Sequence, residues 1–358
     1  MRCTGPLGYA LSGSAVLALL AGCSGGGSSS SPTPLSPAGS QLQSVSRSVS
    51  SLSRQGPQTS SVLRPGVNVV SNPDLSAGFA DVDAATKAAI IVSDAGTNDV
   101  YVYSTAGKLT ATITGFNEPQ GLGGDALGDL YVANTGNSDV LVYPNTYKKI
   151  KATLTDPGQS PVGVDVTPTG VVGVTNIITT AGGPGSVSFY AKGKTTPCVT
   201  VANANWGRVY FGAFDDAGNF YIDGETPSGA VIVGVVKGEC KAKAITTLTT
   251  ANTITFPGGV HVSPTDKIAI DDQSGAAIYT YNPPVKNALG TPVSTTPITG
   301  ASDPVTFAFT KTAADVWTAD AGLAESLEYK YPAGGSPVKT ITGFTQPIGV
   351  VVTPLEAP

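Results

Sequence analysis

The chain has 358 residues, of which 13% are charged and 41% are hydrophobic, with 44 glycines, four cysteines and one histidine. Its formal net charge of −5 provides no basic field for phosphate groups, so we expect no nucleic-acid partner. The single histidine, His261, excludes sites built from several histidines and makes a Ser-His-Asp triad conceivable only through that residue.

Residues 1–23 are predicted to form a lipoprotein signal peptide. The apolar run ALSGSAVLALLAG is too short to span a bilayer, and it ends immediately before Cys23. This ending resembles a bacterial lipobox, which implies that Cys23 carries the lipid that anchors the mature chain in the cell envelope. In an organism that has an outer membrane, the lipobox resemblance together with Ser24 implies an anchor in that membrane or one that faces the periplasm. An ordinary secretory signal with a chance cysteine is the alternative.

Residues 24–75 are rich in Ser, Gly, Pro and Gln and contain few apolar side chains. Such a composition cannot bury enough apolar surface to offset the entropy lost on ordering. We therefore expect a flexible linker that tethers a folded domain over residues 76–358.

Internal repeats dominate the rest of the chain. TITGFNEPQGL begins at Thr112 and TITGFTQPIGV begins at Thr340, a spacing that fits five repeats of about 45 residues. Intermediate copies share one order of features: a proline or aromatic residue, an apolar strand, a turn, and a second apolar strand. A third strand ends in an aromatic residue, and a threonine-rich fourth strand follows.

Four short strands per repeat are typical of a β-propeller blade, because radially packed blades cover each other's faces. The sequence therefore predicts an all-β, six-bladed propeller of four-stranded antiparallel blades. We expect the strand that begins at Pro347 to complete the first blade and close the ring. The alternative is that FADVDAATK, from Phe79, forms the innermost strand of that blade.

The stretch PQGLGGDALGDLYVAN, which begins at Pro119, resembles the NHL-type propeller repeat, and the resemblance extends over residues 79–358. It implies blade architecture more than function, because such propellers include lactonases, streptogramin lyases and many scaffolds. The lactonases imply a Ca²⁺ site of carboxylates and amides, and the lyases imply a histidine with a glutamate. Neither set of residues is found here, so we expect no metal and no cofactor, with Ca²⁺ as the alternative.

Aligned repeats place Asp or Asn at the end of nearly every second strand. Such a column suggests a metal or catalytic site, but Asp and Asn also form turns by hydrogen bonding to the nearby backbone. Gly224 occupies the same column and cannot bind a metal through a side chain, which favours the turn interpretation. The members of this column are Asp94, Asn134, Asn176, Gly224, Asp272 and Asp320.

Innermost strands line a propeller's channel, and His261 lies on one of them. Asp165 occupies the matching position two blades away, so the two side chains are the weak candidates for catalysis at the channel mouth. The alternative is a histidine whose hydrogen bond is satisfied by a neighbouring backbone carbonyl, and we favour it. The same column contains Gly123, Ala213, Ala308 and Val351.

Cys198 and Cys240 remain after the signal peptide and Cys23 are assigned. They lie about one repeat apart, and an oxidising compartment favours a disulfide between them. The function we expect is a monomeric, lipid-anchored envelope module that binds a protein, peptide or glycan and is not an enzyme. The alternative is an envelope hydrolase or lyase, lactonase-like or streptogramin-lyase-like, acting at the channel mouth.

Overall fold

A computed structural model describes residues 68–70 and 88–353. Contacts divide the chain into two units, residues 1–37 and 38–358, and the first lies wholly outside the described residues. Cys23 and the predicted signal peptide therefore lie outside the described part, as do most of the predicted linker and the FADVDAATK segment.

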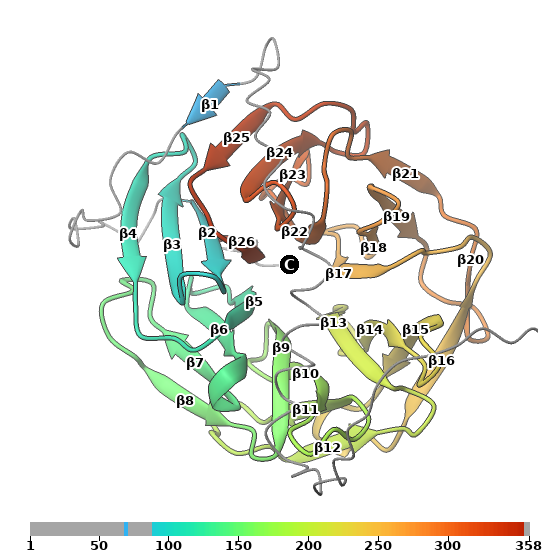
Figure 1. Cartoon of the computed structure of the whole chain (residues 1–358). Helices are drawn as coiled ribbons and strands as arrows, with labels where there is room; N and C mark the ends of the chain where they lie inside the picture. The colour runs from blue at the N-terminus through green and yellow to red at the C-terminus, as the bar shows by residue number, and fades with distance from the viewer. Residues whose placement is uncertain (1–67, 71–87, 354–358) are drawn as a thin grey trace, which may run out of the picture. The chain divides into compact units, whose positions relative to one another are not determined.

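Within the second unit, residues 89–353 form a six-bladed β-propeller of antiparallel blades, as the repeats predict (Figure 1). Blade 1 consists of β26 (Pro347–Thr353), β2 (Ala89–Asp94), β3 (Asp99–Ser104) and β4 (Leu109–Ile113). Blade 2 consists of β5 (Pro119–Gly124), β6 (Leu130–Asn134), β7 (Asp139–Tyr143) and β8 (Ala152–Thr155). Blade 3 consists of β9 (Gln159–Val166), β10 (Val172–Thr179), β11 (Ser186–Tyr190) and β12 (Val199–Ala202).

The second half of the ring repeats this order. Blade 4 consists of β13 (Arg208–Phe214), β14 (Phe220–Glu225), β15 (Val231–Val236) and β16 (Ile245–Thr250). Blade 5 consists of β17 (Pro257–Val262), β18 (Ile268–Asp272), β19 (Ala277–Tyr281) and β21 (Ser294–Pro297). Blade 6 consists of β22 (Pro304–Phe309), β23 (Asp315–Asp320), β24 (Glu325–Lys330) and β25 (Lys339–Thr342). Two single 3₁₀ turns, η1 (Thr135–Asn137) and η2 (Glu239–Lys241), lie in connections.

Burial differs between the inner and outer strands of a blade. Every residue of β2 is buried, because neighbouring blades cover both faces of the sheet there. The outer strand β12 alternates between more and less exposed residues, which is the pattern of a half-covered strand. The apolar core therefore lies between blades, and large side chains such as Trp206 and Trp317 are fully buried in it.

The C-terminal strand closes the ring. β26 pairs antiparallel with β2, so the innermost strand of blade 1 comes from the opposite end of the sequence. Each innermost strand contacts the next one around the channel, and β22 contacts β26 across the junction. The ring therefore has no open seam, as the repeat pattern predicts.

The glycine of each Pro-x-Gly segment allows the innermost strands to approach closely. A Cβ added to Gly121 would lie 2.4 Å from the carbonyl oxygen of Val162, and one added to Gly349 would lie 2.3 Å from that of Gln120. Real Cβ atoms do not approach a backbone oxygen this closely, so a side chain at either position would force blades apart.

Two short strands add to blade edges, and neither is predicted from the repeats. β1 (Asn68–Val70) pairs in parallel with β25, and β20 (Ala288–Gly290) pairs in parallel with β16. Residues 68–70 are therefore a strand and not part of a continuous linker over 24–75. The unpaired edge of β25 explains the difference, because it offers backbone groups to any neighbouring segment.

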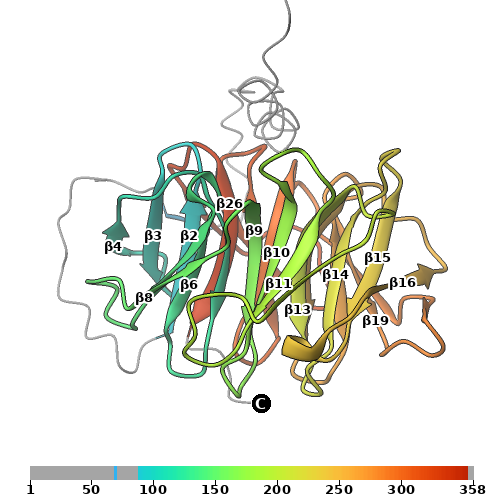
Figure 2. The same ribbon diagram turned by 90° about the horizontal axis from the view of Figure 1, so that it is seen from below.

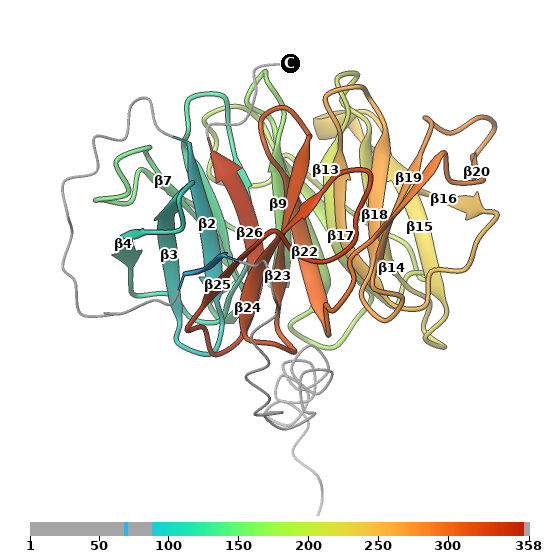
Figure 3. The ribbon, with the colours of Figure 1, turned by 90° about the horizontal axis from the view of Figure 1, so that it is seen from above.

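Antiparallel blades give the propeller two different ends, which we call upper and lower as they lie in Figure 3. The upper end carries the turns between first and second strands and between third and fourth strands, together with Thr353. The lower end carries the turns between second and third strands and the loops that join blades. Figure 2 shows the same ring from the opposite side, with the upper end below.

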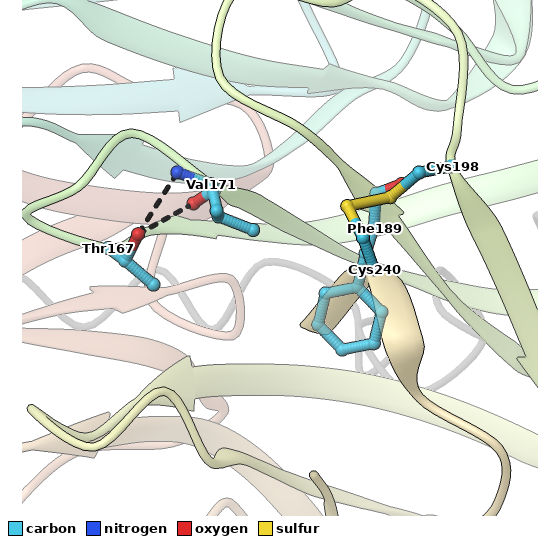
Figure 4. Close-up of a disulfide and its surroundings, with 5 residues drawn as sticks. All are labelled: Thr167, Val171, Phe189, Cys198 and Cys240. Atoms are coloured by element: carbon cyan, nitrogen blue, oxygen red, sulfur yellow. Dashed lines mark hydrogen bonds between the residues drawn. A yellow bond between two sulfur atoms is a disulfide. The ribbon is translucent and has the colours of Figure 1, made fainter. Parts of the chain in front are cut away.

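A disulfide joins Cys198 to Cys240, with 5.3 Å between their Cα atoms (Figure 4). Cys198 precedes β12 and Cys240 lies in η2, so the bond links the upper-end connections of blades 3 and 4. The described residues contain no helix long and apolar enough to cross a membrane.

Candidate functional site: the upper channel mouth

The innermost strands surround a cavity of about 290 Å³ at the upper mouth of the channel. All six blades contribute to its wall. The contributing column is the one predicted from the aligned repeats, and its members are Gly123, Asp165, Ala213, His261, Ala308 and Val351. The repeat alignment therefore identifies the lining of the cavity, including both polar candidates.

His261 is half-buried in the cavity wall, against aromatic rings. Its ring centroid lies 4.9 Å from that of Phe307 and 6.4 Å from that of Phe309, both in edge-to-face geometry. Burial lowers the pKa of His261 to about 4, although a hydrogen bond with the Phe307 backbone opposes this shift. The imidazole is therefore neutral at pH 7, and the backbone contact matches the non-catalytic interpretation of this residue.

Asp165 both lines the cavity and joins two blades. Its Oδ2 accepts a hydrogen bond from the backbone N–H of Phe214, in β13 of the next blade, at 2.8 Å. Burial raises the pKa of Asp165 to about 6, although hydrogen bonds from the backbone of Phe214 and Val166 oppose this shift. At pH 7 the carboxylate is mostly ionised, and one of its oxygens is engaged in the fold.

Four further cavity residues end or follow an innermost strand, and three of them, Phe214, Phe309 and Lys311, are not identified from the sequence. Asp216 and Lys311 place opposite charges at the rim, and Phe214 and Phe309 supply aromatic surface. Their signal in the sequence is their position at or after the end of an innermost strand, where the channel opens. The cavity thus combines an apolar wall with a few converging polar groups, which is typical of ligand sites.

Asp125 and Asp215 directly follow innermost strands, and their carboxylates close turns. Oδ1 of Asp215 accepts hydrogen bonds from the backbone of Ala217 and Asn219, at 3.0 and 2.8 Å. Asp125 accepts equivalent bonds from Leu127 and Asp129. Thr167 closes the same turn of blade 3 by accepting from the Val171 backbone at 3.0 Å (Figure 4). This column is therefore occupied by hairpin turns, which explains its Asp, Thr and Ser composition.

The predicted turn column lies at the lower end, away from the cavity. Asp94 accepts hydrogen bonds from the backbone of Gly96 and Thr97 in its own turn, and from Thr345 and Gln346 before β26. Asp272 and Asp320 make the same two kinds of contact, with their own turns and with the two residues before the proline that begins the innermost strand of the same blade. Each carboxylate therefore ties a turn to the start of an innermost strand.

The remaining members of the column vary this arrangement. Asn134 accepts from the Asn117 backbone at 2.7 Å and donates to Asp139 at 2.8 Å. Asn176 donates to Asp156 and to two neighbouring serine hydroxyls. At Gly224 a Cβ would lie 2.1 Å from the carbonyl oxygen of Arg208, so this blade leaves no room for the side chain. The column members lie on separate blades and do not converge on one point.

No group of three or more His, Cys, Asp or Glu side chains suited to holding a metal ion occurs among residues 88–353. The cavity itself contains two carboxylates and one lysine, which does not match an oxygen-rich calcium site. These residues do not fit the Ca²⁺ site that a lactonase resemblance implies.

The sequence matches no family model and no curated protein. Among solved structures, the chain is similar to a protein of unknown function from Bacteroides caccae, with a TM-score of 0.58 and 10% identity over 75% of this chain and 99% of that one. It is also similar to a chain in a nidogen/laminin complex, with a TM-score of 0.58 and 11% identity over 75% and 100% of the two chains. A third similar structure is virginiamycin B lyase from Staphylococcus aureus, with a TM-score of 0.50 and 14% identity over 71% and 80%. At these identities the comparisons show the shared fold alone.

Proposed function

We propose that the chain is a lipid-anchored, NHL-like propeller of the cell envelope that binds one end of a protein, peptide or glycan in its upper cavity. The observation that carries this proposal is the cavity, which all six blades form around converging polar groups. A concave site with an apolar wall and few polar groups is the usual form of a binding site.

The size of the cavity narrows the ligand. A volume of about 290 Å³ is at the small limit of the roughly 300–1,000 Å³ of typical small-molecule sites. It accommodates a terminal side chain, a dipeptide or one sugar ring, but not a large folded substrate. The proposed ligand is therefore the end of a longer molecule, most of which stays outside the channel.

The polar groups favour binding over catalysis. A general base is most effective when its pKa is near the working pH, and the pKa of His261 is held at about 4. Its described contacts are aromatic edges and backbone, without a carboxylate that orients the ring. Asp165 uses one oxygen to hold Phe214, so its described role is in the fold as well as in the cavity.

The envelope location rests on two features. The Cys23 motif supports lipidation, and the bonded pair Cys198–Cys240 supports an oxidising compartment. We therefore include in the proposal a lipid anchor at Cys23 and a location at the outer membrane.

A cavity-filling variant tests the binding site. Ala308 faces the cavity, whereas Ala126 is exposed on an upper-end turn and does not line it. We expect a panel of envelope peptides and glycan fragments to yield a ligand that binds wild type and Ala126→Trp but not Ala308→Trp. Equal binding by both tryptophan variants, with equal melting temperatures, would place the ligand elsewhere.

The alternative is an envelope hydrolase or lyase, and it is favoured by one observation. His261, Asp165 and Asp216 all line the same cavity, so a base and two carboxylates are available to one bound molecule. This alternative predicts turnover of a lactone or cyclic depsipeptide probe that His261→Gln abolishes while probe binding persists. Absence of turnover by the wild type across both probe classes leaves binding as the function.

A further inference from the structure

Lysines are confined to the upper end of the propeller. Antiparallel pairing places the turns between first and second strands and between third and fourth strands at this end, and every lysine among residues 88–353 lies in or beside one of them. These lysines are Lys108, Lys148, Lys149, Lys151, Lys192, Lys194, Lys237, Lys241, Lys243, Lys267, Lys286, Lys311, Lys330 and Lys339. All but Lys267 and Lys339 are exposed, and every blade contributes at least one.

The lower end has the opposite character. Arg208, at the start of β13, is the one basic side chain of the described ring at this end, and it pairs with Glu225 at 2.7 Å. The turns and loops of the lower end instead carry acidic residues, which are Asp94, Asp99, Glu118, Asp139, Asp156, Asp272, Asp303, Asp320 and Glu325. A net charge of −5 for the chain thus conceals a basic end and an acidic end.

Exposed apolar side chains follow the same division. The large apolar side chains exposed in the described ring are Leu127 (70%), Ile150 (45%), Val285 (72%) and Val293 (52%). All four lie in or beside upper-end turns, in blades 2 and 5. Ile150 has Lys149 and Lys151 as its neighbours in sequence, so apolar and basic groups are interleaved there.

We propose that the upper end of the propeller docks on a membrane surface that contains anionic phospholipids. Lysines near such a surface are attracted to its headgroups, and exposed apolar side chains gain by entering the boundary with the acyl chains. The positive charge of the lysines favours an anionic partner. The exposed apolar side chains among them favour a lipid surface over a soluble polyanion.

The upper end carries nine carboxylates against fourteen lysines, so the carboxylates do not cancel this arrangement. They are Asp125, Asp129, Asp165, Asp215, Asp216, Glu239, Asp266, Asp315 and Glu328. Asp129 pairs with Lys151, and Asp315 pairs with Lys330 at 2.8 Å. Asp165 and Asp216 line the channel mouth, whereas most of the lysines lie on the outer turns between third and fourth strands. The basic groups therefore form a ring around a more acidic centre.

The site where the N-terminal segment joins the ring is compatible with this orientation. Asn68 pairs with Lys339, the first residue of β25 at the upper side of blade 6. A linker of the predicted composition would reach a membrane from either end of the propeller, so the orientation is set by charge and not by the tether. Because the cavity opens at the same end, docking would restrict its proposed ligand to molecules at that surface.

Vesicle binding tests the proposal with residues 38–358, which form one contact unit and contain the whole closed ring. This fragment lacks Cys23 and the apolar leader, and circular dichroism with a thermal melt verifies its folding. We expect it to sediment with vesicles of mixed phosphatidylglycerol and phosphatidylcholine, but not with phosphatidylcholine alone. High salt should release it, because headgroup attraction is screened.

Two triple variants with the same change in net charge separate the ends. The first triple variant removes three exposed upper-end charges by Lys149→Gln, Lys192→Gln and Lys194→Gln. Each lysine near an anionic surface raises the affinity for it roughly fivefold, so vesicle binding should fall about a hundredfold. Ser228→Glu, Ala230→Glu and Ser274→Glu add three negative charges on lower-end turns and should change binding by less than about threefold, since screening weakens distant charges.

Three outcomes of the vesicle assays on wild type and the triple variants would overturn the proposal. They are equal binding of wild type to neutral and anionic vesicles, equal losses in the two triple variants, and no vesicle binding at low salt. A double variant, Leu127→Ser with Ile150→Ser, should weaken vesicle binding and leave dextran sulfate binding unchanged. If it weakens neither, the upper end binds a soluble polyanion instead. None of these outcomes depends on a cavity ligand, so the proposed binding function is tested separately by Ala308→Trp.

Discussion

The two ends of the propeller use charged side chains in different ways. At the lower end, buried carboxylates such as Asp94 and Asp320 accept several backbone hydrogen bonds and tie a turn to the start of the innermost strand of the same blade. At the upper end, exposed lysines surround a cavity, and many of them have no structural task that these contacts reveal. The lower end uses its charged side chains to hold the blades together, whereas the upper end exposes most of its lysines to solvent.

This difference shows why similar residues in a repeat protein require separate interpretations. Asp94 and Asp165 are both aspartates near the ends of inner strands. The first accepts hydrogen bonds only within the framework, while the second also faces the cavity. The position of a residue along its strand sets whether it lies at the upper or the lower end of the propeller. This position therefore determines whether a carboxylate can face a ligand in the cavity.

The largest expected effect is the loss of a lower-end carboxylate. Asp94→Ala leaves four backbone N–H groups without their acceptor, including two at the strand that closes the ring. Hydrogen bonds to charged groups contribute about 1.5–3 kcal/mol each and do not add fully, so we expect a loss of about 3–5 kcal/mol in the free energy of unfolding. Urea denaturation measures it, with the exposed upper-end residue Asp266 changed to alanine as the control.

If Asp94→Ala and Asp266→Ala destabilise the protein equally, the contrast between the two ends is wrong. A change of about 1 kcal/mol is expected for Asp266→Ala, because the side chain is exposed but the residue has a φ of 58°, a left-handed conformation that alanine adopts at a cost.

The disulfide is the next largest contribution, and it lies at the upper end. Replacing Cys198 and Cys240 together with serine releases a covalent link between blades 3 and 4. We expect a loss of about 2–4 kcal/mol in the free energy of unfolding, because a closed loop restricts the unfolded chain. Reducing agent should lower the melting temperature of wild type by the same amount, and an unchanged melt with reductant would contradict the assignment.

A buried carboxyl group provides a pH-dependent test. Asp271 is fully buried, and burial raises its pKa well above the usual range. Neighbouring carboxylates act in the same direction, and a contact with the Asp272 backbone opposes them. A folded-state pKa above the unfolded value means that folding takes up a proton, so this group favours folding less as pH rises above about 4.

Asp271→Asn removes that requirement for a proton. We expect the variant to gain about 1–3 kcal/mol over wild type at pH 8 and to differ little from it at pH 4. Denaturation at the two pH values measures this, and Asp266→Asn, at an exposed position, serves as the control. A variant that is less stable than wild type at pH 8 would show that Asp271 is ionised and usefully bonded.

The smallest effect on stability is expected from the lysines. The triple change of Lys149, Lys192 and Lys194 to glutamine should alter the free energy of unfolding by less than about 0.5 kcal/mol per site, because all three are exposed and appear in no described ion pair. A larger loss would mean that the lysines support the fold, and the functional contrast between the ends would weaken.

Much of the architecture follows from the sequence, because each repeat shows the same pattern of strands and turns. The Pro-x-Gly segments, the aromatic ends of third strands and the final strand at Pro347 predict six blades and their closure. The aligned column through His261 and Asp165 predicts the wall of the cavity. These features are local or periodic, which is what a single sequence can reveal.

Other features depend on how turns are distributed in space. Asp216 and Lys311 reach the cavity because two different turns converge on the channel, and nothing in either segment alone indicates that meeting. The pairing of β1 with β25 depends on an edge that the ring leaves open. The sequence contains a lysine in or beside each turn between third and fourth strands. The net charge of the chain does not reveal this segregation, which becomes visible only when the two ends of the propeller are compared.

The central claim is that a ligand is bound at the upper end and not at the lower one. Hydrogen–deuterium exchange of the protein with and without a ligand found in the peptide and glycan panel tests it directly. We expect added protection around Gly124, Asp216 and Thr310 at the channel mouth, with no change around Asp94 and Asp320. Protection confined to the lower-end turns would contradict the account.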